Sequence, residues 1–140
     1  MKDNNNYNLK GLSLTFKEQF DSSNLFISSY NYNKISINNI FYNFPICIFG
    51  HKIFELNIKN VNILSFNHVK SLITEYKSFN KVDPELILIG INDYKLKVVI
   101  KIKNICEKNN IGFDIMKVGQ ASGTFNFLTI EKRNFITLFI

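Results

Sequence analysis

The stretch Gly112–Arg133, GFDIMKVGQASGTFNFLTIEKR, joins a short apolar segment to a run of small residues and then to a mixed segment that ends in charges. The apolar segment GFDIM is typical of a β-strand. After the small residues, Ala121, Phe125 and Leu128 recur at helical spacing, so a short helix is expected to open near Gly119. The stretch therefore predicts a tight strand-to-helix turn, with Phe125 and Leu128 buried against a sheet.

The segments around this stretch extend the same pattern. Upstream, ELILIGI (85–91) is continuously apolar, which favours a strand buried on both faces, and NFITLFI (134–140) is another apolar strand. Residues 95–106 alternate like a strand but also carry a helical stripe, so the residues alone leave both readings open. A helix is favoured, because two parallel strands need a crossover between them. The second half therefore indicates an α/β domain.

The first half carries short strands at hairpin spacing, followed by one helix. LSLTF (12–16) alternates apolar and polar residues, and a turn is expected near residues 31–33, between two further short strands. From Phe66 onward apolar residues recur at spacings of three and four, and Ser65 is placed to cap that helix. Residues 1–24 are interpreted as an N-terminal tail with a possible first strand, and residues 25–140 as a single α/β domain.

The net charge of +6 suggests a nucleic-acid partner, but the kind of basic residue argues against one. Of the 17 basic residues only Arg133 is an arginine, and the lysines are scattered along the 140-residue chain. Asn, Ile, Lys, Phe and Tyr dominate, as codon bias in an A/T-rich genome would produce. Arginine makes the bidentate contacts to phosphate and guanine that nucleic-acid recognition uses. We therefore predict no nucleic-acid binding.

Cysteine usage and the N-terminus indicate the cellular setting. Cys47 and Cys106 lie in apolar surroundings without metal-ligand spacing, so two buried, reduced thiols are predicted, with no metal and no cofactor. The polar start MKDNNNYN lacks the apolar core of a signal peptide, and no apolar run approaches the length of a membrane span. A cytoplasmic protein that is not transmembrane is expected.

The run from Gly119 to Ser122 is the main candidate for a binding site. A glycine loop that leads into a helix offers free backbone N–H groups, so Gly119, Gln120, Ala121 and Ser122 are predicted to favour an anion. Ser122 does not sit in the Gly-x-Ser-x-Gly arrangement of a hydrolase nucleophile, and nothing places His51 or His68 beside it. No catalytic residue is therefore predicted.

The charges of this region are assigned a structural role. Arg133 is retained where the composition favours lysine, which indicates a geometric need for its planar guanidinium. Asp114 and Glu131 are the expected partners of a partly buried ion pair, and Arg133→Lys is then expected to destabilise the fold. Phe125, Asn126 and Leu128 complete the set of residues predicted to support the fold.

Four ordered blocks of the chain resemble one widespread family of small domains found in bacteria and archaea. It includes mitochondrial complex I assembly factor 3 and an adipogenesis-associated protein with an Mth-type domain. The resemblance covers about residues 25–140 and rests on matching residues in family order: Gly90, Gly112, Met116, Ala121, Thr124, Phe125, Asn126, Leu128, Glu131 and Arg133. The chain departs from the family pattern at four positions: Phe66, Asn92, Val118 and Gly123.

The resemblance implies a three-layer α/β fold around a mixed, largely parallel sheet with flanking helices and an N-terminal β-hairpin layer. It also implies a non-enzymatic role in assembling respiratory NADH–quinone oxidoreductase, through a protein partner that could hold the chain at a membrane. Gly123 stands where the family carries an arginine, and this removes a fixed positive charge from the predicted Gly119–Ser122 site. The alternative is a small-molecule or anion-binding protein, or an enzyme, that uses that site.

Overall fold

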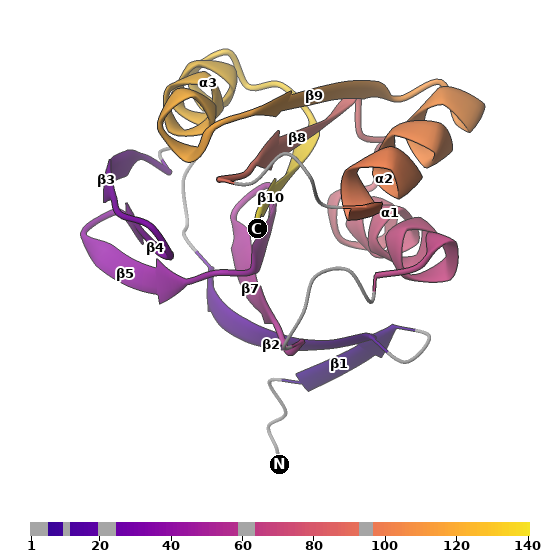
Figure 1. Ribbon diagram of the computed structural model, residues 1–140, viewed down its shortest axis with the longest axis horizontal. Helices are drawn as coiled ribbons and strands as arrows, with labels where there is room; N and C mark the ends of the chain where they lie inside the picture. Colours follow the sequence, from indigo (N-terminus) through magenta and orange to yellow (C-terminus); the bar gives the residue numbers. More distant parts are fainter. Residues whose placement is uncertain (1–5, 10–11, 20–24, 59–63, 93–96) are drawn as a thin grey trace.

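The computed structural model describes residues 6–9, 12–19, 25–58, 64–92 and 97–140. Ten strands and three helices are described there (Figure 1). In chain order they are β1 (Asn6–Leu9), β2 (Leu12–Gln19), β3 (Ile27–Tyr30), β4 (Lys34–Ile37), β5 (Ile40–Asn43), β6 (Ile46–Phe49), β7 (Lys52–Leu56), α1 (Phe66–Asn80), β8 (Leu86–Gly90), α2 (Lys97–Lys108), β9 (Gly112–Met116), α3 (Val118–Ile130) and β10 (Phe135–Phe139).

The main sheet has seven strands in the order β1-β2-β7-β6-β10-β8-β9. The C-terminal strand β10 lies inside it, antiparallel to β6 and parallel to β8, and β8 is parallel to β9. The predicted mixed sheet is confirmed, but it is parallel only among β8, β9 and β10. The other neighbouring strands pair antiparallel: β1 with β2 and β6 with β7 are consecutive in the chain, whereas β2 with β7 and β6 with β10 are strands distant in sequence.

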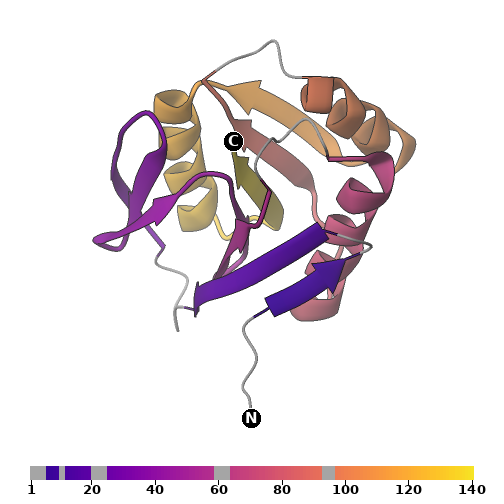
Figure 2. The ribbon, with the colours of Figure 1, turned by 60° about the horizontal axis from the view of Figure 1, so that its bottom comes forward.

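This sheet is the middle of three layers, as predicted. Helices α1 and α2 cover one face, and α3 lies on the other face beside a separate three-stranded sheet, β3-β4-β5 (Figures 1 and 2). Side chains of β10 alternate between the two cores: Ile136 and Leu138 pack with α1 and α2, whereas Phe135 and Phe139 pack with α3. A continuously apolar strand therefore reflects burial on both faces.

One segment differs from its prediction, and the structure decides another that the residues alone leave open. Residues Asn6–Leu9, interpreted as part of a tail, form β1 and pair antiparallel with β2. The ambiguous segment 95–106 is helical from Lys97, as favoured, and α2 ends at Lys108 before Asn110 in the left-handed region. Asp93 precedes this helix and is a residue type that caps helix starts, but it lies outside the described residues.

Helix α1 begins where the sequence predicts. Ser65 caps it: the Ser65 hydroxyl accepts a hydrogen bond from the His68 backbone N–H at 3.2 Å, and the His68 side chain accepts one from the Ser65 N–H at 3.1 Å. Val69, Leu72 and Tyr76 form its buried face. The capping residue and the periodic apolar stripe therefore both indicate the same helix.

We expect Ser65→Ala to lower the free energy of unfolding by about 1 kcal/mol, because the first turn of α1 loses its side-chain acceptor. Urea denaturation measures the change. Ser78→Ala is a suitable control, since Ser78 is an exposed residue near the C-terminal end of the same helix. An equal effect at both positions would contradict a specific capping role.

Candidate functional site

The predicted binding run forms the first turn of α3, not a loop. Lys117 alone connects β9 to this helix, which begins at Val118. The Ala121 N–H donates to the Lys117 carbonyl at 2.8 Å, and the Ser122 hydroxyl donates to the Val118 carbonyl at 2.8 Å. Ala121 and Ser122 are buried, so their polar groups are occupied within the helix. Only the amides of the first turn remain for an external partner.

A shallow groove of about 480 Å³ does lie at this helix start, lined by Tyr30, Asn92, Lys117, Val118, Gly119 and Gln120. It lies where β8 and β9 end, on the side where parallel sheets commonly bind ligands. A Cβ at Gly119 would meet the hydroxyl of Tyr30, an exposed side chain that would have to move aside. Of the four predicted ligand-binding residues, Gly119 and Gln120 thus face the groove.

The histidines lie apart from the Ser122 hydroxyl. His68 is engaged in the cap of α1, on the opposite face of the main sheet from α3. His51 lies in the turn between β6 and β7. No hydrogen bond joins either histidine to Ser122 within the described part of the chain. The same part contains no group of three or more His, Cys, Asp or Glu side chains that could hold a metal ion.

Both thiols are free and buried. Burial raises the pKa of Cys47 well above its ordinary value. It also raises the pKa of Cys106 to about 11, with a smaller contribution from the nearby Glu107 carboxylate. Both cysteines are therefore protonated at neutral pH and poor nucleophiles. The predicted reduced, structural thiols are confirmed.

Arg133 has a partner that sequence analysis missed. Its Nη2 and Nε atoms lie 2.9 and 3.0 Å from Glu85 Oε1, whereas Glu131 Oε1 is 4.0 Å from Nη1. Glu85 Oε2 also accepts from the Asn134 N–H at 3.3 Å. The hydrogen bond from Arg133 is the largest cause that lowers the pKa of Glu85. Asp114 is exposed on β9 and is not part of this cluster.

The signal for this pair is the strand register, which only the structure supplies. Leu86 of β8 lies opposite Phe135 of the parallel strand β10, so Glu85 and Asn134, which precede them, are also neighbours. Once the parallel pairing is recognised, Glu85 becomes the nearest carboxylate to Arg133. The predicted partners Asp114 and Glu131 rest on the expected placement of one strand and one helix end, and that placement does not give the strand register.

The predicted destabilisation by Arg133→Lys is revised by this geometry. The side chains of Arg133 and Glu85 are 47% and 44% exposed, so water screens the pair and its contribution is small. We expect Arg133→Lys to melt with the wild-type protein in a thermal scan at moderate salt. A clearly lower melting temperature would show that the guanidinium has a structural role that an exposed ion pair does not explain.

Asn126 attaches the small sheet to α3. Its carboxamide oxygen accepts from the Ile27 N–H at 2.8 Å, and its amide nitrogen donates to the Ile27 carbonyl at 3.0 Å. On the inner side of the helix, Phe125 and Leu128 are buried, as predicted. Helix α3 is therefore held on two sides, by the core and by β3.

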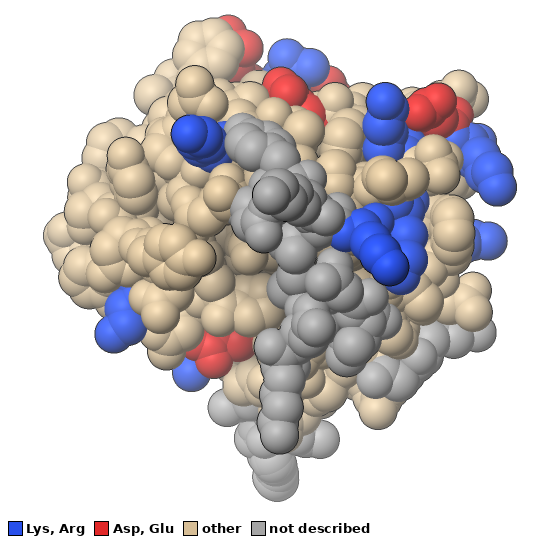
Figure 3. Space-filling view, in the orientation of Figure 1, with Lys and Arg blue, Asp and Glu red and all other residues tan. Residues whose placement is uncertain are grey.

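Exposed apolar side chains lie close in sequence to the two residues of this attachment, Ile27 and Asn126. Phe26 precedes Ile27, Phe127 follows Asn126, and Ile130 lies one helical turn beyond Asn126 on the same side of α3. Their exposed fractions are 54%, 59% and 75%. We refer to Phe26, Phe127 and Ile130 as the apolar patch. In Figure 3 the side over β3–β5 and α3 is largely free of charge, whereas lysines gather over α1 and α2.

The family described as "Protein of unknown function (DUF498/DUF598)" matches residues 27–140. The chain belongs to this family. The match includes every element from β3 to β10, and so it contains the shallow groove and, apart from Phe26, the apolar patch. No curated protein sequence matches the chain.

Solved structures with the same fold come from several bacteria. An outer membrane protein from Bartonella henselae is 19% identical, with a TM-score of 0.61, over 81% of this chain and 92% of that chain. A Bordetella pertussis protein described as a Mth938-like domain is 15% identical, with a TM-score of 0.60, over 89% of this chain and 91% of that chain. A Xanthomonas campestris protein is 15% identical, with a TM-score of 0.54, over 84% of each chain.

At these identities the likeness shows the fold alone. The description of one relative as an Mth938-like domain agrees with the Mth-type resemblance found in the sequence. The description of another as an outer membrane protein concerns that protein. Within the described part of this chain, no helix combines the length and apolar character needed to cross a membrane.

Proposed function

We propose that this DUF498/DUF598 domain is a non-enzymatic interaction protein that binds a partner protein through the apolar patch. The observation that carries the proposal is the grouping of Phe26, Phe127 and Ile130 around one attachment point. Single exposed apolar residues are ordinary on a protein surface, but adjacent ones mark interaction sites.

The patch is also rigid enough to be specific. Both polar groups of Asn126 hold the Ile27 backbone, and Phe125 fixes the opposite side of α3 in the core. A partner would therefore meet a preformed surface and lose little additional conformational entropy on binding. Phenylalanine side chains present large apolar areas of the kind that dominate interface energetics.

The nature of the partner follows from the resemblance of the sequence to the complex I assembly factor 3 family. We infer that the partner is a subunit or assembly factor of respiratory NADH–quinone oxidoreductase, on the cytoplasmic side of the membrane. Membrane association would then be peripheral and would depend on that partner. The assignment as non-enzymatic is supported by the lack of any hydrogen bond between Ser122 and either histidine among the described residues.

Affinity purification of the tagged protein from its own host tests this proposal. Wild type is compared with the double variant Phe127→Asp/Ile130→Asp, which places charge on the patch. Ile100→Asp is the matched control, because Ile100 is 63% exposed on α2, on the opposite face. We expect wild type and the control to recover subunits of the respiratory complex and the double variant to lose them.

Two results would count against the proposal. One is recovery of no respiratory-complex subunit by any variant, which would reject the inferred partner. The other is equal recovery by wild type and the double variant, which would reject the patch as the binding surface. Circular dichroism of each purified variant establishes that lost binding does not reflect lost folding.

The groove at the start of α3 supports a second candidate function, the binding of a small anion. Gly119 and Gln120 present first-turn amides to it, and Lys117 adds a positive charge. Titration with inorganic phosphate, followed by NMR at the Gly119 and Gln120 amides, tests this site. We expect saturable shifts there that Lys117→Gln weakens. Absence of saturation would exclude the groove as an anion site.

A further inference from the structure

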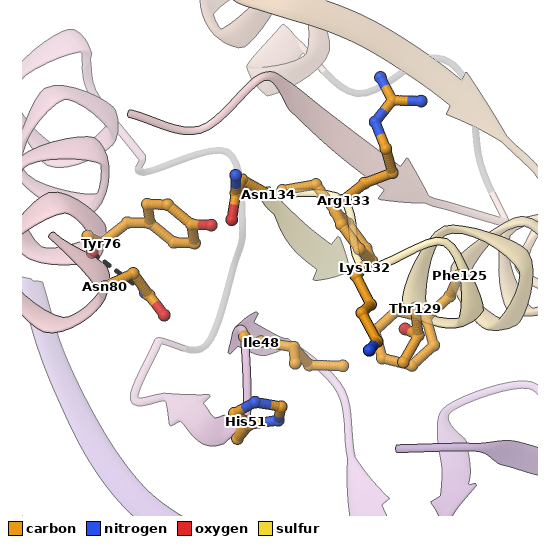
Figure 4. A pocket seen from close by; sticks show the side chains of 11 residues that line it. Ile48, His51, Tyr76, Asn80, Phe125, Thr129, Lys132, Arg133 and Asn134 are labelled. Atoms are coloured by element: carbon orange, nitrogen blue, oxygen red, sulfur yellow. Dashed lines mark hydrogen bonds between the residues drawn. The ribbon is translucent and has the colours of Figure 1, made fainter. Parts of the chain in front are cut away.

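A separate cavity of about 270 Å³ opens at the other end of α3 (Figure 4). It is enclosed by the end of α1, the turn between β6 and β7, and the connection from α3 to β10. The shallow groove at the start of α3 shares no lining residue with it. The cavity is smaller than the roughly 300–1,000 Å³ typical of sites for drug-sized ligands, so only a small molecule fits.

The cavity has an apolar floor and a polar rim. Ile48, Phe125 and Phe135 form the floor, and these side chains come from β6, α3 and β10. The polar groups around them come from six residues: His51, Tyr76, Asn80, Thr129, Lys132 and Asn134. A small number of polar groups that converge over an apolar surface is the usual composition of a small-molecule site.

The charge on this rim is positive. Lys132 forms no ion pair with any described residue, and the described residues that line the cavity include no carboxylate. Arg133 also borders the cavity, but its guanidinium is held by Glu85 and points away in Figure 4, whereas the Lys132 side chain extends toward Ile48 and Thr129. An anion would therefore find the Lys132 cation, while the Glu85 carboxylate, whose charge reaches Tyr76, is paired with Arg133 and does not line the cavity.

His51 provides an independent observation. Its Nδ1 atom is buried and has no hydrogen-bond partner among the described residues. A buried polar atom without a partner costs free energy that a hydrogen bond from or to a ligand would recover.

Burial, with a smaller contribution from the charge of Glu85, raises the pKa of Tyr76 to about 12. The Tyr76 phenol therefore stays protonated at neutral pH and remains a hydrogen-bond donor.

We propose that this cavity binds a small organic anion, such as a carboxylate on a short apolar body. The charged head lies near Lys132 and His51, and the apolar body lies against the floor. Neither the family description nor the interaction through the apolar patch assigns a ligand to this place. The proposal therefore stands independently of the partner protein.

Benzoate is a suitable probe, because it joins a carboxylate to a flat apolar ring. Titration of the full chain is followed by two-dimensional NMR, with benzamide as the neutral analogue and inorganic phosphate as the anion without an apolar body. We expect benzoate to shift resonances of residues that line the cavity, and benzamide and phosphate to bind more weakly. Equal binding of benzoate and benzamide, or of benzoate and phosphate, would overturn the proposed ligand class.

Lys132→Gln removes the charge while keeping most of the side chain. We expect it to raise the dissociation constant for benzoate by about tenfold or more, as for loss of one hydrogen bond to a charged group. Lys81→Gln is the matched control, since Lys81 is an exposed lysine whose φ of 63° is close to the 57° of Lys132. Lys81 does not line the cavity, so its variant should bind like wild type.

A second variant keeps the test decisive if Lys132→Gln does not fold. His51→Phe preserves an aromatic ring but removes the buried nitrogen, and it should also weaken benzoate binding. Unchanged affinity in whichever of the two variants folds, or an absence of benzoate-induced shifts in wild type, would overturn the site.

Discussion

Replacement of Phe125 by alanine is expected to lower the free energy of unfolding by about 3–5 kcal/mol, the range for truncation of a buried phenylalanine. The side chain is only 1% exposed and packs edge-on against Phe135, with ring centroids 5.6 Å apart. It joins α3 to the main sheet in the core shared with the small sheet. Its removal would enlarge the neighbouring cavity, which surrounding side chains can fill only in part.

Urea denaturation followed by circular dichroism measures this loss. Phe127→Ala is the matched control, because Phe127 lies on the same helix two residues away and is largely exposed. The control should change stability by roughly 0.5 kcal/mol or less, as for most surface substitutions. Similar losses at the two positions would show that the buried face of α3 has been misassigned.

The second large effect is expected at Gly90, the last residue of β8. A Cβ atom at this position would lie 2.6 Å from Phe139 Cδ1 and 2.9 Å from Ala121 Cβ. Phe139 is directly opposite Gly90 in the parallel register, and its ring has no room to retreat because it is fully buried. We therefore expect Gly90→Ala to destabilise the protein by about 1–3 kcal/mol through overpacking.

Gly123→Ala provides the matched control for this substitution. Gly123 is exposed within α3, and no atom lies within 4 Å of the position that a Cβ would take. Because alanine favours a helix interior, this variant should gain roughly 0.5–1 kcal/mol. If packing determines these effects, thermal or urea unfolding should show that Gly90→Ala is less stable than wild type and Gly123→Ala more stable. A loss of stability at Gly123, or none at Gly90, would contradict these assignments.

Several elements could be predicted from local sequence because their causes are local. Ser65 caps α1 through a residue three positions away, and the apolar stripe that follows has helical period. The continuous apolar run of β8 indicates a strand buried on both faces, and the structure confirms this. Phe125 and Leu128 share one helical face, so their common burial also follows from spacing alone.

The candidate sites could be predicted only in part. The run Gly119–Ser122 was correctly placed near the start of a helix, but whether its amides are free depends on where that helix begins. Helix ends are set by capping and packing and are poorly marked in sequence. Because Val118 is already helical, Ala121 and Ser122 form bonds within α3 and only Gly119 and Gln120 face the groove.

Sequence by itself determined the α/β class, the helices with clear periodicity, the buried strand β8 and the buried, reduced cysteines, because each rests on residues within a few positions of one another. Tertiary structure alone decided that Glu85 binds Arg133, that β10 lies inside the sheet, and that His51 and Lys132 border one cavity. These contacts join segments far apart in the chain. Their pairing depends on strand register and on the packing of layers, and no local pattern in a single sequence specifies either.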